Sequence, residues 1–192
     1  MRAFLSYDIS DPIFLGRVEH LQRELKATGA DLKLVNPKIL HFTIRFLGEI
    51  EKAEKDQIVK VLQGKVENFE LDLAFKGVGA FPDDRRISVI WIGIDPSSAT
   101  ALERKANEIN ALIRSILILG DQKEERFSPH VTISRVRSGR NKEKLTEFLR
   151  QHRYDDFGTT KISVLRLKLS ELTPAGPEYS DLHVFEKEKP SA

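Results

Sequence analysis

Cysteine is absent from this chain of 192 residues, which also contains only one methionine and one tryptophan. The absence of cysteine excludes disulfide scaffolds, zinc–thiolate sites, iron–sulfur clusters and cysteine nucleophiles. No apolar run is long enough to span a membrane, and the N-terminus reaches Asp8 too soon for a secretory signal peptide. Hydrophobic residues make up 40% of the chain and charged residues 31%. We therefore expect a folded, soluble, cytoplasmic protein with no membrane attachment.

Charge is nearly balanced overall, with a net charge of +2, but it is unevenly placed. The segment from Arg126 to Arg153 carries eight basic residues that only Glu143 and Glu147 oppose, which gives +6 there and −4 in the rest of the chain. A local basic patch on a nearly neutral protein suits a phosphate-bearing partner. A charge run by itself is more often a solvated helix face and loop, so charge alone does not decide.

Hydrophobic periodicity predicts a mixture of strands and helices with no linker between domains. The expected strands are Arg2–Asp8, Leu32–Leu34, Leu40–Phe46, one beginning near Phe69, Ser88–Ile94, Val131–Val136, one beginning near Phe157, Ser163–Ser170 and His183–Phe185. The expected helices are Pro12–Thr28, Ala53–Leu62, a long helix capped by Ser97 or Ser98 and reaching Ile116, and Lys142–Leu149. The composition of Gly77–Arg86 predicts a turn, and that of Pro174–Pro177 a loop.

An internal repeat organises these elements. The tetrapeptide His41-Phe42-Thr43-Ile44 recurs 89 positions later as His130-Val131-Thr132-Ile133, and a strand and a long helix precede each copy. We therefore expect a duplicated α+β fold in one bilobal, monomeric domain spanning residues 1–192. Its halves are roughly 1–85 and 86–172, and the C-terminal segment completes the sheets. Two lobes related by a pseudo-two-fold axis, each with an antiparallel sheet and outer helices, would bring both histidines into one cleft.

The spacing within each tetrapeptide places the histidine imidazole and the threonine hydroxyl on one face of a strand. His41 and Thr43 share a face, whereas Phe42, Ile44 and Phe46 point the other way into a core. His130 and Thr132 share a face in the same manner. Two imidazoles facing one substrate can act as one acid and one base near neutral pH. This pair suits displacement at phosphorus without a metal, with threonine hydroxyls donating to the phosphoryl oxygens.

The histidines have two other interpretations, an incidental place on a strand and a metal site. A lone His-x-Thr tripeptide is a weak signal, but two copies at equivalent places in a repeat are harder to dismiss. Zinc usually requires three or four protein ligands, and His20, His152 and His183 have no spacing that pairs them with either motif. We therefore expect no metal and no cofactor. His20 and His152 are expected to face solvent.

Longer motifs surround the histidines and carry a resemblance across nearly the whole chain. They are Arg2-Ala3-Phe4, the stretch from His41 to Glu49 (HFTIRFLGE), Gly79-Ala80-Phe81-Pro82, Val89-Ile90-Trp91-Ile92-Gly93, the stretch from Phe127 to Arg135 (FSPHVTISR), and the stretch from Ser170 to Tyr179. On these residues the sequence resembles the two-histidine (2H) phosphoesterase superfamily, and within it the RNA 2′,3′-cyclic phosphodiesterases, historically called 2′-5′ RNA ligases.

The resemblance implies metal-independent hydrolysis of a 2′,3′-cyclic phosphate at an RNA end, leaving a 2′-phosphate. It implies that His41 is the proton donor and His130 the proton acceptor, although a pseudo-symmetric site permits either direction. Ligation would be the reverse step, with a 5′-hydroxyl in place of water. The implied partner is RNA with a cyclic phosphate end, tRNA halves being one candidate, and no obligate protein partner is expected.

Departures from the repeat are expected to give specificity. By strand parity Arg45 lies on the His41 face and its counterpart is Ser134, so Arg45 is expected to contact phosphate or the preceding nucleotide. Phe127 is expected to stack on a base or to join the core, and Arg126 to follow the RNA backbone. The parity of Arg135 places it opposite His130. An RNA-end-binding module without turnover, and an esterase for a small cyclic nucleotide, remain alternative functions.

Overall fold

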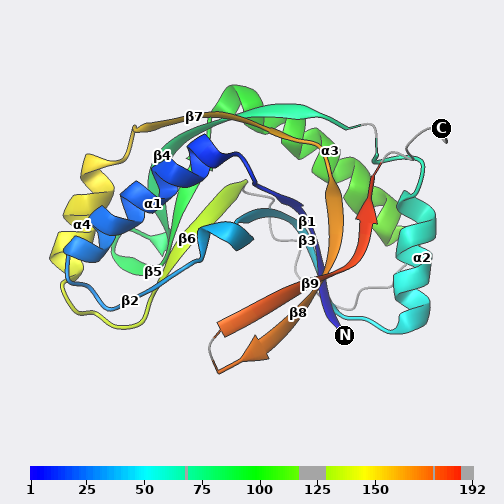
Figure 1. Ribbon diagram of the computed structural model, residues 1–192, viewed down its shortest axis with the longest axis horizontal. Coiled ribbons are helices and arrows are strands. Elements are labelled where there is room, and N and C mark those ends of the chain that lie inside the picture. Colours follow the sequence, from blue (N-terminus) through cyan, green and yellow to red (C-terminus); the bar gives the residue numbers. More distant parts are fainter. Residues whose placement is uncertain (68, 117–128, 175, 187–192) are drawn as a thin grey trace.

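The computed structural model describes residues 1–67, 69–116, 129–174 and 176–186, which form an α+β fold (Figure 1). Its strands are β1 (Arg2–Asp8), β2 (Leu32–Leu34), β3 (His41–Glu49), β4 (Leu71–Asp83), β5 (Arg86–Ile94), β6 (His130–Val136), β7 (Asp156–Ile162), β8 (Leu165–Thr173) and β9 (Gly176–Phe185). Its helices are α1 (Pro12–Ala27), the short 3₁₀-helix η1 (Pro37–Ile39), α2 (Lys52–Leu62), α3 (Pro96–Arg114) and α4 (Lys142–Gln151). Within those ranges, no helix is both long and apolar enough to cross a membrane.

The strands form two antiparallel sheets, which confirms the predicted fold class. One sheet has four strands in the order β3-β1-β8-β9, and the other has five in the order β2-β6-β5-β4-β7. In each sheet a motif strand, β3 or β6, lies beside the strand that precedes it in the repeat, β1 or β5. The next strand is exchanged, because β4 pairs with β5 and β8 pairs with β1. Each sheet therefore contains strands from both parts of the chain.

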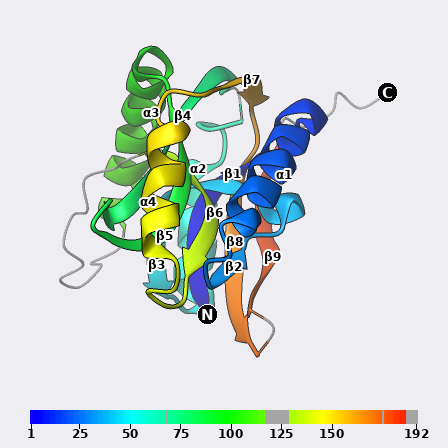
Figure 2. The same cartoon turned by 90° about the vertical axis from the view of Figure 1, so that its left-hand side faces the viewer.

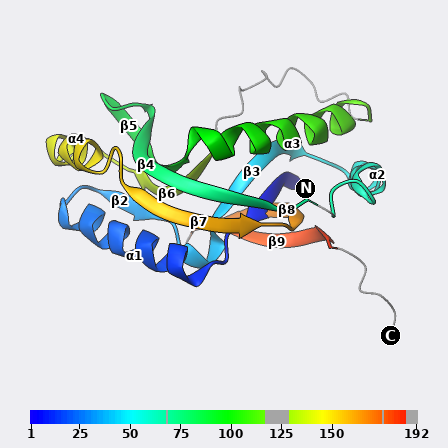
Figure 3. The same cartoon turned by 90° about the horizontal axis from the view of Figure 1, so that it is seen from above.

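The two long helices differ in which sheet they contact. Helix α1 follows β1 of the four-stranded sheet but contacts β6 and β7 of the other sheet, whereas α3 follows β5 and contacts β4 of the same sheet and β3 of the other. The side chain of Gln22 on α1 anchors this packing, since its Nε2 donates to the backbone oxygens of Val35 at 2.7 Å and Ile133 at 2.9 Å. Helices α1 and α3 lie on opposite sides of the molecule (Figures 2 and 3).

A single hydrophobic core connects the sheets. Its buried residues come from both sheets and all four α-helices. The ring of Phe75 on β4 lies 4.2 Å from that of Phe14 on α1 and 5.4 Å from that of Phe42 on β3, measured between centroids. Phe75 therefore links the helix and sheet that the exchange brings together.

Local sequence explains where the long helices begin. Asp11 caps α1 by accepting a hydrogen bond from the Phe14 amide at 2.8 Å, and the predicted apolar stripe of this helix is buried. The prediction that Ser97 or Ser98 caps α3 is wrong, because Asp95 is the N-cap and accepts from the Ser97 amide. Proline at the first helical position, with an aspartate before it, is the common signal at both starts.

The expected turn at Gly77–Arg86 is wrong, since β4 continues to Asp83 and the reversal occurs only at Asp84 and Arg85. A register shift in β4 between Phe75 and Val78 accommodates the glycine. Gly77 has φ +76°, and a Cβ at this position would lie 2.5 Å from the backbone oxygen of Arg153. The expected loop at Pro174–Pro177 is likewise shorter, because β9 begins at Gly176.

Candidate active site

His41 and His130 begin equivalent strands in the two sheets. His41 is the first residue of β3 and His130 the first of β6, and these strands approach one another. The positive charge of His130 contributes to lowering the pKa of His41. The structure therefore brings the two motif strands together, with the imidazoles close enough to interact electrostatically.

The His41 ring is held by one hydrogen bond and two aromatic side chains. Its Nδ1 lies 2.8 Å from the backbone oxygen of Ile39. In the neutral ring this contact makes Nδ1 the protonated nitrogen, and it leaves Nε2 to exchange a proton with a substrate. The rings of Phe4 and Tyr179 lie 5.1 Å and 5.2 Å away, so the plane of the imidazole is restrained.

The His130 ring has an aromatic setting of its own. The ring of Phe81 meets it edge-on at 4.7 Å, and the indole of Trp91 lies 6.2 Å away. Both aromatic residues come from the β4–β5 hairpin. Like His41, His130 is half-buried, so both imidazoles are rigidly placed and remain partly accessible.

The threonines lie where strand parity predicted. Thr43 and Thr132 are half-buried, and the residues between each threonine and its histidine, Phe42 and Val131, are fully buried. The hydroxyl groups therefore share the face of the imidazole two residues before them.

A β-bulge follows each threonine. In β3 the register passes from Thr43 opposite Ser6 directly to Arg45 opposite Leu5, so that Ile44 is the extra residue. In β6 the register passes from Thr132 to Ser134, so that Ile133 is the extra residue. The bulge thus occurs at the same position of both motifs, and it reverses the faces of the residues that follow.

The prediction that Arg45 lies on the His41 face is wrong because of this bulge. Arg45 lies opposite the buried Leu5, and its Nη1 donates to Oδ1 of Asn110 on α3 at 3.1 Å. Its counterpart Ser134 is fully buried. Arg45 therefore points toward a packed helix and not toward the histidines.

The bulge brings Phe46 and Arg135 onto the histidine faces, where parity did not expect them. Phe46 lies opposite Phe4 with ring centroids 6.1 Å apart, and it is 59% exposed rather than part of the core. Arg135 lies opposite Val89 on the exposed part of β6. Burial raises the pKa of Tyr179, and the charge of Arg135 counteracts this effect, so Arg135 acts on a residue of the other sheet.

Known proteins are similar to this chain in sequence. A family model described as the AKAP7 2′5′ RNA ligase-like domain matches residues 3–180. A Methanothermobacter thermautotrophicus protein named RNA 2′,3′-cyclic phosphodiesterase is 34% identical over 187 residues, covering 96% of this chain and 98% of the relative. The chain belongs to the RNA 2′,3′-cyclic phosphodiesterase family of the 2H phosphoesterases. A protein of the same name from Archaeoglobus fulgidus is 34% identical over 186 residues, with 97% and 100% covered.

Solved structures share the fold of this 2H phosphoesterase. A crystal structure of a Thermus thermophilus protein matches with a TM-score of 0.75 and 24% identity, covering 96% of this chain and 97% of the other. The apo crystal structure of Escherichia coli LigT matches with a TM-score of 0.69 and 20% identity, covering 95% of each chain. These matches confirm the predicted bilobal fold.

Four charged residues form a cluster beside His41 that the sequence analysis missed. Lys168 on β8 is 8% exposed, and its Nζ lies 2.8 Å from Oδ2 of Asp8 and 3.7 Å from Oδ1 of Asp181. Arg166 pairs with the same two carboxylates. Asp8 is the register partner of His41. The alternation Leu165-Arg166-Leu167-Lys168-Leu169 was the available sequence signal, since it predicts two cations on one strand face.

This cluster and the surrounding burial together set the protonation of His41. Burial lowers the pKa of His41 below its ordinary value of 6.5, and the charges of Lys168 and His130 lower it further. The Ile39 carbonyl and the Asp8 carboxylate act in the opposite direction and raise it. The free protein therefore holds His41 mainly as the neutral imidazole at neutral pH.

The other residues singled out in the sequence have different outcomes. Arg126 and Phe127 lie outside the described residues, so their predicted roles are untested. His20 is exposed on α1 as expected, with 66% of its side chain accessible. The prediction that His152 faces solvent is wrong. Its Nδ1 lies 2.7 Å from Oδ2 of Asp155, and its Nε2 lies 3.7 Å from Glu24 on α1.

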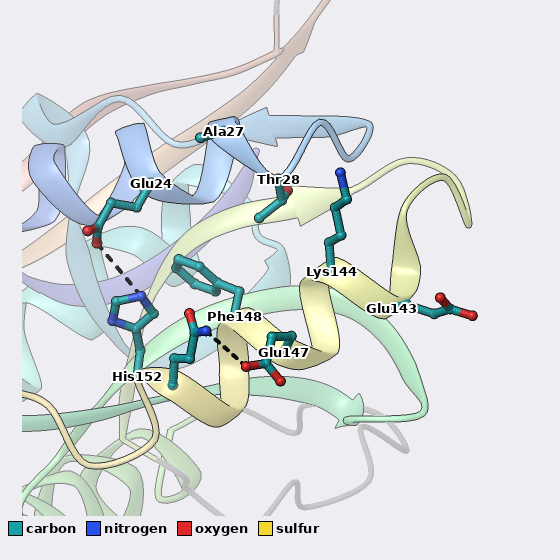
Figure 4. Close-up of a pocket in the computed structure, with 9 residues that line it drawn as sticks. Glu24, Ala27, Thr28, Glu143, Lys144, Glu147, Phe148 and His152 are labelled. Carbon is teal, nitrogen blue, oxygen red and sulfur yellow. Dashed lines mark hydrogen bonds and ion pairs between the residues drawn. The ribbon is translucent and has the colours of Figure 1, made fainter.

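His152 belongs to a groove between α1 and α4 (Figure 4). The groove has a volume of about 470 Å³, and its acidic lining residues are Glu24, Glu143 and Glu147. Lys144 also lines it, and His152 reaches across it toward Glu24 (Figure 4). Carboxylates on both walls disfavour a phosphate ligand, so this groove is an unsuitable place for the reaction that the histidines indicate.

Proposed function

We propose that this protein hydrolyses the 2′,3′-cyclic phosphate at the end of an RNA strand to a 2′-phosphomonoester, without a metal. The observation that carries the proposal is the pair of bulged His-x-Thr strands, which start at His41 and His130 and present neighbouring imidazoles. Relatives that are 34% identical over nearly their whole length bear the name of this activity, which supports the same substrate class here.

In the proposed mechanism His130 accepts a proton from water as the water oxygen attacks phosphorus. The new P–O bond forms as the bond between phosphorus and the 3′ oxygen breaks, and His41 donates its proton to that leaving oxygen. Each proton transfer is expected to contribute roughly 10²–10⁴ in rate. Thr43 and Thr132 donate hydrogen bonds to the two non-bridging phosphoryl oxygens, which carry the developing charge.

The lowered pKa of His41 is compatible with its role as the acid once substrate is bound. The cyclic phosphate is an anion, and an anion beside an imidazole favours the protonated form. Bound substrate would thus act in the same direction as Asp8, which already raises the pKa of His41. Substrate binding and protonation of His41 are then coupled.

Phe46 and Arg135 are suited to hold the nucleotide. Phe46 presents an exposed ring next to Phe4, whose own ring contacts His41, and the terminal base can stack on it. Arg135 supplies the cation that strand parity predicts at Arg45, and it lies on the His130 face. Ligation by a 5′-hydroxyl would follow the same path in reverse, and in water it should be the minor reaction.

The test is product analysis on an RNA with a 2′,3′-cyclic phosphate end, in the presence of EDTA. We expect a 2′-phosphate product from the unaltered protein, and a loss of at least about 10²-fold in kcat for His41→Ala and for His130→Ala. Circular dichroism should show both variants to be folded. Retained turnover in both variants would contradict the proposal. Binding without product would favour an RNA-end-binding module, and turnover of mononucleotides alone would favour a small-molecule esterase.

A further inference from the structure

A cavity of about 760 Å³ opens next to His130, where β4, β5, the start of α3 and the end of α4 meet. Trp91, Gly93 and Pro129 line the part nearest the histidine. Trp91 and Gly93 are the register partners of Thr132 and His130, and Pro129 directly precedes His130. This cavity, the α4 cavity, is therefore continuous with the strand face that carries the second motif. Helix α4 stands beside β4 and β5 (Figure 2).

Two aromatic side chains line the α4 cavity. The six-membered part of the Trp91 indole rests on Gly79, where an added Cβ would lie only 2.3 Å from the ring. Glycine at this position thus lets the indole lie against the sheet, with its remaining surface toward the cavity. Tyr154, just beyond α4, is 77% exposed and lines the same space. Aromatic rings with an accessible face are the usual stacking surfaces for unpaired bases.

Cations gather on the β4 and α4 side of the cavity. Lys76, Arg150 and Arg153 line it there. Arg150 pairs with Glu147, and Lys76 lies 3.9 Å from Asp95. Within the part of the chain that the structure describes, Arg153 has no carboxylate at ion-pair distance, and its guanidinium lies 6.0 Å from the Tyr154 ring.

The acidic lining residues restrict the path that a phosphate chain could follow. They are Asp84, in the turn after β4, and Glu103, on α3. A polyanion is therefore expected to avoid α3 and to run along α4. This path also gives a role to the basic segment of the sequence, because Arg135 lies at the histidines and Arg150 and Arg153 lie in the cavity.

We propose that the α4 cavity binds the nucleotides on the 5′ side of the RNA end whose cyclic phosphate is held by His41 and His130. Trp91 and Tyr154 stack on bases, and Arg153 and Lys76 contact backbone phosphates. This inference rests on the proposed function and extends it. It predicts that the enzyme prefers an RNA strand of several nucleotides to a mononucleotide.

The test compares adenosine 2′,3′-cyclic monophosphate with a single-stranded RNA of about eight nucleotides that ends in the same group. The measured quantity is the ratio of kcat/KM for the RNA to kcat/KM for the mononucleotide. We expect the double variant Lys76→Gln/Arg153→Gln to lower this ratio about tenfold. Loss of two phosphate contacts should also reduce the slope of log KM for the RNA against log salt concentration by about 1.4.

The matched control also removes two positive charges, from residues that do not line the cavity. Arg140→Gln/Lys144→Gln changes the net charge by the same amount, so it reproduces any effect of the protein's overall electrostatic field. Because neither residue lines the cavity, the ratio should stay within about twofold of that of the unaltered protein. A second variant, Tyr154→Ala, removes one stacking surface and should lower the ratio roughly tenfold. Because both Arg153 and Tyr154 are exposed, these variants should fold.

The outcomes separate this proposal from the proposed function. If the unaltered protein turns over neither substrate, the proposed function fails. If it turns over both with equal kcat/KM, or if the cavity variants and the control lower the ratio equally, the hydrolase stands and the α4 cavity is not an RNA subsite.

Discussion

At the residue scale, burial lowers the pKa of His41, and two charges of opposite sign in one cluster then adjust it. Asp8 raises its pKa and Lys168 lowers it, although the two residues are themselves paired at 2.8 Å. Substituting either residue leaves the other beside the imidazole. The cluster therefore offers a matched pair of changes with opposite expected signs.

We expect the pKa of His41 in the free protein to lie below 6.5, lower still in Asp8→Asn and higher in Lys168→Met. Removing the carboxylate takes away the attraction that favours the imidazolium, and removing the ammonium takes away a repulsion. NMR titration of the imidazole resonances checks this, with His41→Gln used to assign the signal. A shift of the same sign in both variants would show that burial, and not the cluster, controls this group.

At the element scale, the bulges decide which residues meet the substrate. Strand parity places Arg45 on the His41 face and Phe46 on the core face of β3. The structure shows the reverse, because the extra residue Ile44 reverses the faces beyond Thr43. Phe46 should therefore matter for binding, and Arg45 for the attachment of α3.

We expect Phe46→Ala to raise KM for the RNA about tenfold, since stacking on one base is worth ~1–3 kcal/mol, while the melting temperature changes little. Arg45→Met should have the converse effect. It should lower the free energy of unfolding by about 1–2 kcal/mol through loss of the bond to Asn110, with KM within about twofold. Steady-state kinetics and urea unfolding of both variants check this. The opposite pattern would mean that Arg45 contacts the substrate.

Most elements could be predicted from the sequence because their periodicity is strong. The stripe Phe14, Val18, Leu21 and Leu25 is sufficient to place α1, and the two tetrapeptides locate both motif strands. The bulges were not predictable, because an extra residue in a ladder depends on the partner strand and leaves the apolar pattern of β3 nearly intact. The extension of β4 through Gly77 could not be predicted for a related reason. Glycine is required there by the approach of the Arg153 backbone, which is a contact between residues distant in the sequence.

At the scale of the whole molecule, the repeat predicts two halves, but the structure exchanges elements between them. Helix α1 packs on the sheet that contains the second motif, and β4 and β8 each pair with a strand from the other half. This exchange could not be predicted from the sequence, because periodicity identifies the buried face of an element without identifying the element that covers it. The two histidines are therefore held in position by one shared core.

A shared core should unfold as one unit, and Phe75 is the residue that tests this. Its ring contacts Phe14 on α1 and Phe42 directly after His41, so Phe75→Ala should lower the free energy of unfolding by ~3–5 kcal/mol. The fluorescence of Trp91, the single tryptophan, reports on the five-stranded sheet, and far-UV circular dichroism reports on the whole chain. We expect both signals to give one urea midpoint in the unaltered protein and one lower midpoint in the variant. Separate midpoints would mean that the lobes unfold independently, and the relative placement of His41 and His130 would then depend on an interface between lobes instead of a common core.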